Sequence, residues 1–307
     1  MSEYSQQFGG SWTDQKLDCL QKYLHAYATI FNANQRAKFF TTIYLDAFAG
    51  TGYRVANLRT DEPIPADEEP TLSEEEKLLL KGSARIALEL EPGFKRYIFV
   101  ERDPSRVEEL KRLRDEFPSK DILVEHGDAN TYIQTWTAQT DWEKHRAVVF
   151  LDPYGMQVQW RTIQSIADTR AIDLWFLFPA GIAVSRMLPK DKPPPDSWGR
   201  RLTELFGSEE WRDRFYTSSE QETLFGAEET LQRDASLANI GNFLIERLET
   251  AFDTGGVLRQ LMVLRNSRRS PMYLLCFACG NPRAKGTALK IAGDLVTKYT
   301  FAEFLSV

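Results

Sequence analysis

The sequence predicts an α/β protein built on a doubly wound, mostly parallel sheet of the Rossmann-like type. The first observation is that short apolar runs alternate with amphipathic helical patterns along the first 178 residues. The second is that the runs 148–151 and 174–178 are apolar without interruption, as expected of strands covered on both faces. Because a strand, a helix and a further strand require a crossover connection, the strands of this region are expected to be parallel.

The predicted elements follow one another in a regular order. Five strands are expected at 42–48, 96–101, 122–125, 147–151 and 172–178. Helices are expected at 12–31, from 82 onward, at 105–117 with Pro104 in the first turn, at 128–137 and at 160–169. Two later strands, 257–264 and 271–278, are expected to form an antiparallel hairpin with the basic tip 265–269, followed by a helix over 288–299.

The alternation stops between residues 179 and 256. This stretch contains three consecutive prolines at 193–195 and helical patterns near Trp198 and over 237–252. We therefore expect an inserted helical subdomain over 179–256, a candidate for target recognition. The sheet domain would comprise 1–178 and 257–307. Aromatic residues at helical spacing are expected to form the insertion's own core: Trp198, Phe206, Trp211 and Phe215.

Composition limits the classes of protein to consider. With 307 residues, 42% of them hydrophobic, the chain is long enough to bury a substantial core. It has no apolar run of about 20 residues that could cross a bilayer, and its polar start lacks the pattern of a secretory signal. Only three cysteines occur, which predicts no disulfide framework and favours a cytoplasmic protein.

No metal site is expected. Cys276 and Cys279 form a CxxC pattern, but they belong to an apolar run that is typical of a strand. Residues three apart on a strand point to opposite faces, so we expect two core cysteines. The histidines are scattered singly, without the spacing of metal ligands: His25, His126 and His145.

The net charge of −6 is concentrated in one segment. Residues 61–76 hold eight acidic side chains and no basic one, and without them the remaining charge is +2. They belong to a proline-containing insertion at about 55–81 that interrupts the sheet domain. Net charge therefore does not exclude a nucleic-acid partner.

Two predicted strands end in residues that suit a nucleoside pocket, which in doubly wound sheets lies beyond the carboxyl ends of the strands. Asp46 ends the first strand and is followed by Phe48, Ala49 and the turn Gly50-Thr51-Gly52, where glycine allows a ligand to approach the backbone closely. Glu101 ends the second strand, before Arg102. Its carboxylate could accept hydrogen bonds from both ribose hydroxyls. The alternative is a solvated acid near the start of a helix.

Two further strand ends extend the pattern. Asp128, followed by Ala129, could accept a hydrogen bond from an adenine amino group or could simply cap its helix. The fourth strand ends in Asp152-Pro153-Tyr154-Gly155, which in isolation would be a turn. Each feature is common alone, but four of them at successive strand ends predict a pocket for S-adenosylmethionine (SAM).

A combination of motifs resembles the three-Cys-motif partner protein family (TcmP), a family with a class I methyltransferase-like fold. The motifs are Trp12-Thr13 with Lys16, the stretch 44–52, Gly82-Ser83, and the stretch 150–155. The family name implies a protein partner that bears a three-cysteine motif. The resemblance covers the chain from its first helix to about residue 179.

More distantly, the layout is similar to the RlmJ-type ribosomal-RNA adenine-N6 methyltransferases. This similarity implies that Lys16 and Ser83 meet the methionine carboxylate of SAM. The chain departs from that pattern at Ala84, where those enzymes have proline, and at Tyr154-Gly155, where they have Pro-Tyr. Asp-Pro-aromatic-Gly instead resembles the loop of tRNA guanine-N2 methyltransferases. Both groups of enzymes methylate an exocyclic amine, so the resemblance implies this type of acceptor and leaves the base open.

These observations predict a SAM-dependent N-methyltransferase that acts on an exocyclic base amine of nucleic acid, with RNA favoured. Asp152 and the Pro153 carbonyl would orient the amine, and Tyr154 would stack on the base. The predicted cofactor-binding residues are Lys16, Asp46, Phe48, Ala49, Gly50, Gly52, Ser83, Glu101, Arg102, Asp128 and Ala129. The alternatives are a catalytically silent SAM-binding or nucleotide-binding scaffold, and a methyltransferase that acts on a protein or a small molecule.

Basic residues outside the core are candidates for phosphate contacts. For each of them, ordinary solvated surface is the alternative. The candidates are Arg186, Lys190, Lys192, Arg200, Arg201, Arg265, Arg268 and Arg269.

Overall fold

A computed structural model describes most of the chain, namely residues 11–49, 82–153, 155–190, 192–223, 226–253, 255–266 and 268–305. Side chains are described in these ranges except at 11–14, 218–230 and 300–305. The acidic insertion at about 55–81 lies outside the described residues. The predicted turn Gly50-Thr51-Gly52 and Tyr154, which was predicted to stack on the base, also lie outside the described residues.

A seven-stranded sheet forms the centre of the structure, with the strand order β3-β2-β1-β4-β5-β9-β8. Its strands are β1 (Thr41–Ala47), β2 (Arg96–Glu101), β3 (Ile122–His126), β4 (His145–Leu151), β5 (Ile172–Phe178), β8 (Met262–Arg265) and β9 (Pro271–Cys279). The first five strands are parallel, and β9 runs antiparallel to both β5 and β8. This arrangement confirms the predicted methyltransferase-like doubly wound sheet with a C-terminal antiparallel hairpin.

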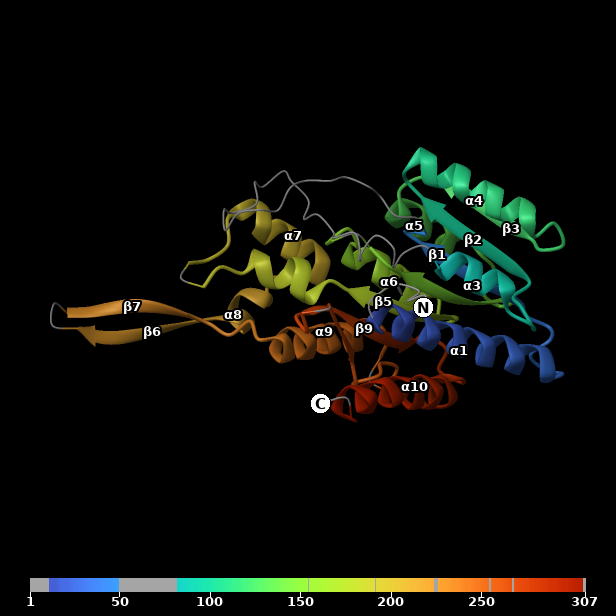
Figure 1. Ribbon diagram of the computed structural model, residues 1–307. Helices are drawn as coiled ribbons and strands as arrows, with labels where there is room; N and C mark the ends of the chain where they lie inside the picture. The colour runs from blue at the N-terminus through green and yellow to red at the C-terminus, as the bar shows by residue number, and fades with distance from the viewer. Residues whose placement is uncertain are drawn as a thin grey trace, which may run out of the picture.

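Helices cover both faces of the sheet (Figure 1). One face is covered by α1 (Ser11–Ala33), α3 (Ser83–Glu89), α4 (Pro104–Glu116) and α10 (Lys285–Leu305), and α1 packs beside α10. The other face is covered by α5 (Ala129–Gln139), α6 (Trp160–Asp168) and α9 (Leu237–Ala251). Within the described part of the chain, no helix is both long and apolar enough to cross a bilayer.

Alternation along the strands explains why they are apolar throughout. Tyr44 and Phe150 belong to the core beneath α1, whereas their neighbours Leu45 and Leu151 belong to the core beneath α5 and α6. Successive side chains of a strand point to opposite faces, so a sheet that is covered twice needs an apolar residue at nearly every position.

The region 179–256 is only partly as predicted. A π-helix η1 (Ala180–Val184) and a 3-10 turn η2 (Ser185–Met187) follow β5, and then come α7 (Asp196–Phe206), α8 (Trp211–Phe215) and α9. The helices expected near Trp198 and over 237–252 are confirmed as α7 and α9. A two-stranded ribbon, β6 (Tyr216–Thr223) and β7 (Gly226–Arg233), was not predicted. It projects from the body of the protein (Figure 1), and its polar sequence lacks the apolar alternation that marks a strand.

The expectation that the inserted aromatic residues form their own core is wrong. Phe206, Trp211 and Phe215 are buried in the same cluster as the sheet residues Phe176 and Phe178. Phe206 contacts Phe178 directly, with ring centroids 5.7 Å apart. The helices of this region therefore extend the main core instead of enclosing a second one.

The C-terminal strands differ from the prediction in one boundary. β8 begins at Met262, and Val257 makes only an isolated bridge to Ala278. Cys276 and Cys279 are free and buried. Their side chains belong to the cores on opposite faces of the sheet, as their spacing on a strand predicts. Among the described residues, no group of histidine, cysteine and acidic side chains could hold a metal ion.

Candidate functional site

The carboxyl ends of β1, β2 and β4 meet at one edge of the sheet, called the carboxyl edge below. In the strand register, Asp46 of β1 lies opposite Phe99 of β2 on one side and Phe150 of β4 on the other. Strand order reverses between β1 and β4, which is where open α/β sheets bind ligands. Topology thus places Asp46, Glu101 and Asp152 at neighbouring strand ends, as predicted.

Asp46 is completely buried beneath α1. Tyr44, two residues earlier on the same face of β1, donates a hydrogen bond of 3.1 Å from its hydroxyl to Asp46 Oδ2. The other carboxylate oxygen, Oδ1, has no hydrogen-bond partner among the described residues. A buried acceptor without a donor is costly, so Asp46 presents an unused acceptor at the carboxyl edge.

Burial raises the pKa of Asp46 to about 7. Hydrogen bonding from Ser83 and Tyr44 and the positive charge of Lys16 oppose this effect, whereas the negative charge of Asp152 adds to it. Ser83, at the start of α3, is itself 4% exposed. Ser83, which the resemblance places at the methionine carboxylate of SAM, therefore lies next to the Asp46 carboxyl and lowers its pKa. The two residues come together although the segment 50–81 separates them in sequence.

Lys16 and Asp152 form a buried ion pair that was not predicted. Lys16 Nζ lies 2.7 Å from Asp152 Oδ2, with side chains that are 0% and 4% exposed. The same ammonium group lies 5.4 Å from the centroid of the Phe150 ring, a favourable cation–π position. Burial raises the pKa of Asp152, and the charge and hydrogen bond of Lys16 oppose this rise. The structure thus joins a residue predicted on the cofactor side to one predicted on the acceptor side.

The charges of this cluster do not balance among themselves. Lys16 can compensate one carboxylate, and the ion pair with Asp152 uses it. Asp46 and Asp152 are close enough for the charge of Asp152 to raise the pKa of Asp46. When both carboxyls are ionised, the three groups carry one net negative charge inside the protein. A cation that binds at this edge would be stabilised by that charge.

The backbone after β1 turns sharply. Phe48 has φ of 67°, in the left-handed region that non-glycine residues seldom occupy. The Ala49 amide then donates a hydrogen bond of 3.1 Å to the Val100 carbonyl of β2. Such strain costs on the order of 1–3 kcal/mol and persists where the surrounding structure demands it. Phe48 and Ala49 therefore lie at the carboxyl end of β1, directly after Asp46 and Ala47.

Glu101 is buried at the end of β2, and its side chain binds the backbone of the two residues that follow it. Glu101 Oε1 accepts hydrogen bonds of 2.7 Å from the amides of Arg102 and of Asp103. Asp103 in turn caps the first turn of α4. This geometry fixes the carboxylate of Glu101 at the carboxyl edge, whereas the Arg102 side chain is exposed.

Asp128 caps a helix, the simpler of its two interpretations. Its Oδ1 accepts hydrogen bonds from the amide and the hydroxyl of Thr131, at 2.9 and 3.0 Å. The residue is exposed, and these bonds use only one of its two oxygens. Ala129, the first residue of α5, is buried in the core. The cap thus holds this part of the predicted site at the carboxyl edge next to β2.

Asn130 is a buried residue of the site that sequence reasoning missed. Its Nδ2 donates to the Gln157 carbonyl at 2.8 Å. Its Oδ1 accepts from the Gln159 amide at 3.0 Å and from the Thr162 hydroxyl at 2.9 Å. Asn130 therefore fastens the start of α5 to the chain between Asp152 and α6. Its position directly after Asp128-Ala129 was the only signal in the sequence.

Replacing Asn130 with alanine should lower the free energy of unfolding by about 1–3 kcal/mol, because the Gln157 carbonyl, the Gln159 amide and the Thr162 hydroxyl each lose a hydrogen-bond partner. Urea denaturation measures this change. Asn239→Ala is the matched control, since Asn239 also binds backbone carbonyls, those of Asp234 and Arg214, but far from the site. Equal losses in the two variants would contradict a special role for the Asn130 contacts.

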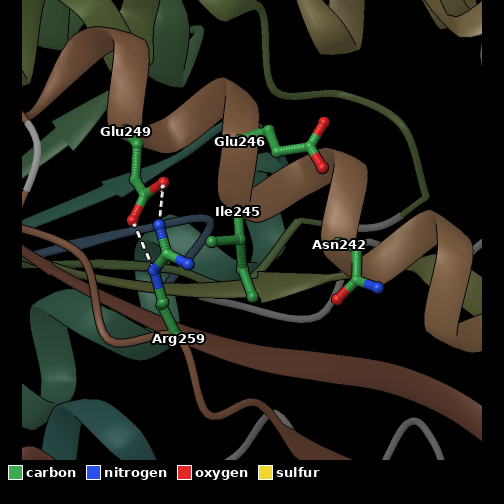
Figure 2. A pocket seen from close by; sticks show the side chains of 5 residues that line it. All are labelled: Asn242, Ile245, Glu246, Glu249 and Arg259. Atoms are coloured by element: carbon green, nitrogen blue, oxygen red, sulfur yellow. Dashed lines mark hydrogen bonds and ion pairs between the residues drawn. The ribbon is translucent and has the colours of Figure 1, made fainter.

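A separate surface pocket of about 300 Å³ lies along α9. Figure 2 shows Glu249 and Arg259 at its wall, joined by two hydrogen bonds of 2.9 Å. Asn242, Ile245 and Glu246 complete the lining. It contains none of the predicted site residues, so it is distinct from the carboxyl edge.

No family model matches the chain, and no curated protein matches it. Similar solved structures include a Legionella pneumophila protein described by the family label DUF519, with 15% identity over 80% of this chain and 94% of that one (TM-score 0.37). A SAM-dependent methyltransferase from Clostridium acetobutylicum has 9% identity over 86% and 92% (TM-score 0.37). The N-terminal domain of EvdMO1, with SAH bound, has 12% identity over 85% and 80% (TM-score 0.34). Likenesses of this size assign neither a family nor an activity to the chain.

Proposed function

We propose that the chain is a SAM-dependent methyltransferase whose acceptor is an exocyclic amine of a nucleic-acid base, with RNA favoured. The observation that carries the proposal is the convergence of Lys16, Asp46 and Asp152, all buried, at the carboxyl ends of β1 and β4. Buried ionisable groups with perturbed pKa values cluster at functional sites. They lie next to the point where the strand order reverses, beyond which sheets of this type bind nucleotides.

The residues at this edge suit SAM. Asp46 Oδ1, which has no partner among the described residues, would accept a hydrogen bond from an ammonium group, and the net negative charge of the cluster favours a cationic ligand. Glu101, at the end of β2, has the position that in dinucleotide-binding sheets serves the ribose hydroxyls. When bound, SAM supplies an electrophilic methyl group on a positively charged sulfur.

On the acceptor side, Asp152 and Pro153 end β4 next to the same cluster. An exocyclic amine is a poor nucleophile because its lone pair is delocalised into the ring. Hydrogen bonds from the amine to the Asp152 carboxylate and the Pro153 carbonyl would orient it and restore its tetrahedral character. Asp152 would then accept the proton that the amine loses. Asn130 would support this work by fastening the chain that follows Asp152.

The resemblance to the TcmP family, and more distantly to RlmJ-type and tRNA guanine-N2 enzymes, supports a base amine as the acceptor. It also supports a protein partner with a three-cysteine motif. A base must leave its stack to reach such a site, so single-stranded RNA is the substrate form that we favour. The helices and ribbon of the region 179–256 would serve in target recognition.

Transfer of a labelled methyl group from SAM to RNA tests this proposal. Wild-type protein should label RNA, and Asp152→Asn should slow transfer by about 100- to 10,000-fold, the range that a positioned acid–base group contributes. Asn32→Ala, which alters the end of α1 remote from Lys16, should transfer at the wild-type rate. DNA, peptides and metabolites are assayed in parallel. SAM binding without transfer to any of these acceptors would contradict the enzyme and favour a scaffold.

A further inference from the structure

The turn between β8 and β9, residues 265–270, lies at the carboxyl edge. Leu274 of β9 pairs with Phe178, the last residue of β5, so the chain before Leu274 extends beyond the end of β5. Pro271 pairs with Arg265 at the base of the turn. The backbone of Gly181 in η1 packs so closely on Pro271 that a Cβ at this glycine would lie 1.9 Å from the Pro271 carbonyl oxygen. The turn is therefore held against the segment that follows β5.

Hydrogen bonds join Asn266 to residues 268–270 across the turn. Asn266 Oδ1 accepts from the amides of Arg268 at 3.0 Å and of Ser270 at 2.9 Å. The Asn266 amide donates to the Ser270 carbonyl at 3.0 Å, and the Arg269 amide donates to the Asn266 carbonyl at 2.8 Å. Arg269 adopts the left-handed conformation, with φ of 60°. A turn ordered in this way loses little entropy when it binds a ligand.

The turn carries two exposed arginines, Arg268 and Arg269. Neither forms an ion pair with a described carboxylate. Elsewhere, basic residues such as Arg85 and Arg96 pair with nearby acids. Residues 254–293 contain seven basic residues and no acidic one, and of the seven Arg259 pairs with Glu249 of α9. In a chain of net charge −6, this stretch is a local source of positive potential.

We propose that Arg268 and Arg269, in the turn after β8, bind the phosphate backbone of the acceptor nucleic acid at the same edge of the sheet as Asp152. This inference rests on the proposed function and names the surface that holds its substrate. The planar guanidinium group matches phosphate with paired hydrogen bonds. Arginine side chains are the usual contacts to nucleic-acid phosphates, so nucleic acid is the partner that the chemistry favours.

The test measures the affinity of the protein for a fluorescent single-stranded 20-mer RNA at several salt concentrations. The variant is Arg268→Ala with Arg269→Asn, because asparagine tolerates the left-handed conformation. Loss of two phosphate contacts should reduce the slope of log affinity against log salt by about 1.4, at about 0.7 for each contact with a single strand. SAM affinity, measured by calorimetry, should stay at the wild-type value.

The control is Arg112→Ala with Arg114→Ala, which removes the same charge from α4, next to the opposite margin of the sheet. Its salt slope should equal that of the wild type. If wild-type protein binds the RNA and the turn variant keeps the wild-type slope, the inference about the turn is overturned and the proposed function stands. If wild-type protein binds neither this RNA nor the matching DNA, the nucleic-acid acceptor is overturned together with the turn.

Discussion

Replacing Asp152 with alanine should lower the free energy of unfolding by about 3–5 kcal/mol, because it leaves the Lys16 ammonium buried without its partner. Lys16 is 0% exposed and lies 2.7 Å from Asp152, so its charge stays buried when the carboxylate is lost. Chemical denaturation of the SAM-free protein measures this loss. Among single substitutions in the site, we expect this effect on stability to be the largest.

A double-mutant cycle separates the ion pair from the rest of the site. Lys16→Met combined with Asp152→Leu removes both charges and keeps apolar volume. This double variant should be within about 1–2 kcal/mol of the wild type, since buried ion pairs are often replaceable by apolar residues. Additive losses in the two single variants would contradict the pairing of Lys16 with Asp152. The double variant should also be inactive, which would separate the role of the pair in the reaction from its effect on folding.

Replacing Asp46 with asparagine should stabilise the SAM-free protein at pH 8. The folded-state pKa of about 7 exceeds the ordinary value of 3.8. The folded protein therefore holds this proton more tightly than the unfolded chain does. This contribution to stability is complete below about pH 4, decreases as the pH rises, and is lost above about pH 7. The rise in pKa from 3.8 to about 7 corresponds to about 4 kcal/mol of unfolding free energy. Asparagine removes this pH dependence because it has no charge to bury.

Unfolding free energies of the wild type and of Asp46→Asn at pH 5 and pH 8 measure this effect. The difference between the two proteins is the informative quantity, because burial also raises the pKa of Asp173 to about 6, and both proteins share that group. The gain from Asp46→Asn should be larger at pH 8 than at pH 5. A gain that does not change with pH would contradict the burial of an ionisable carboxyl at this position.

Much of the fold could be predicted because local patterns and global architecture agree. The run 172–178 was placed at its observed limits as β5, since a strand covered twice is apolar at every position. Glycine and proline marked several boundaries, including Pro104 at the start of α4. The β6–β7 ribbon could not be found in this way. Its sequence is mostly polar and lacks the alternation of apolar and polar residues that marks a half-buried strand.

The candidate site was predicted residue by residue, but its internal pairing was not. Asp46 and Asp152 were expected because each ends a strand. The contact between Lys16 and Asp152 depends on how α1 crosses the sheet, and nothing in the local sequence specifies that crossing. Asn130 was missed for the same reason, since its partners, such as Thr162, are distant in sequence.

The measurement that tests the central claim most directly is calorimetric titration of SAM into the wild type and into Asp46→Asn. The site predicts micromolar binding to the wild type, weakened by at least about 10-fold in the variant, because a charged hydrogen bond is worth about 1.5–3 kcal/mol. Asn239→Ala should bind SAM as the wild type does. Equal affinities in the wild type and Asp46→Asn, or no heat of binding with folded wild-type protein, would contradict a SAM site at the carboxyl edge.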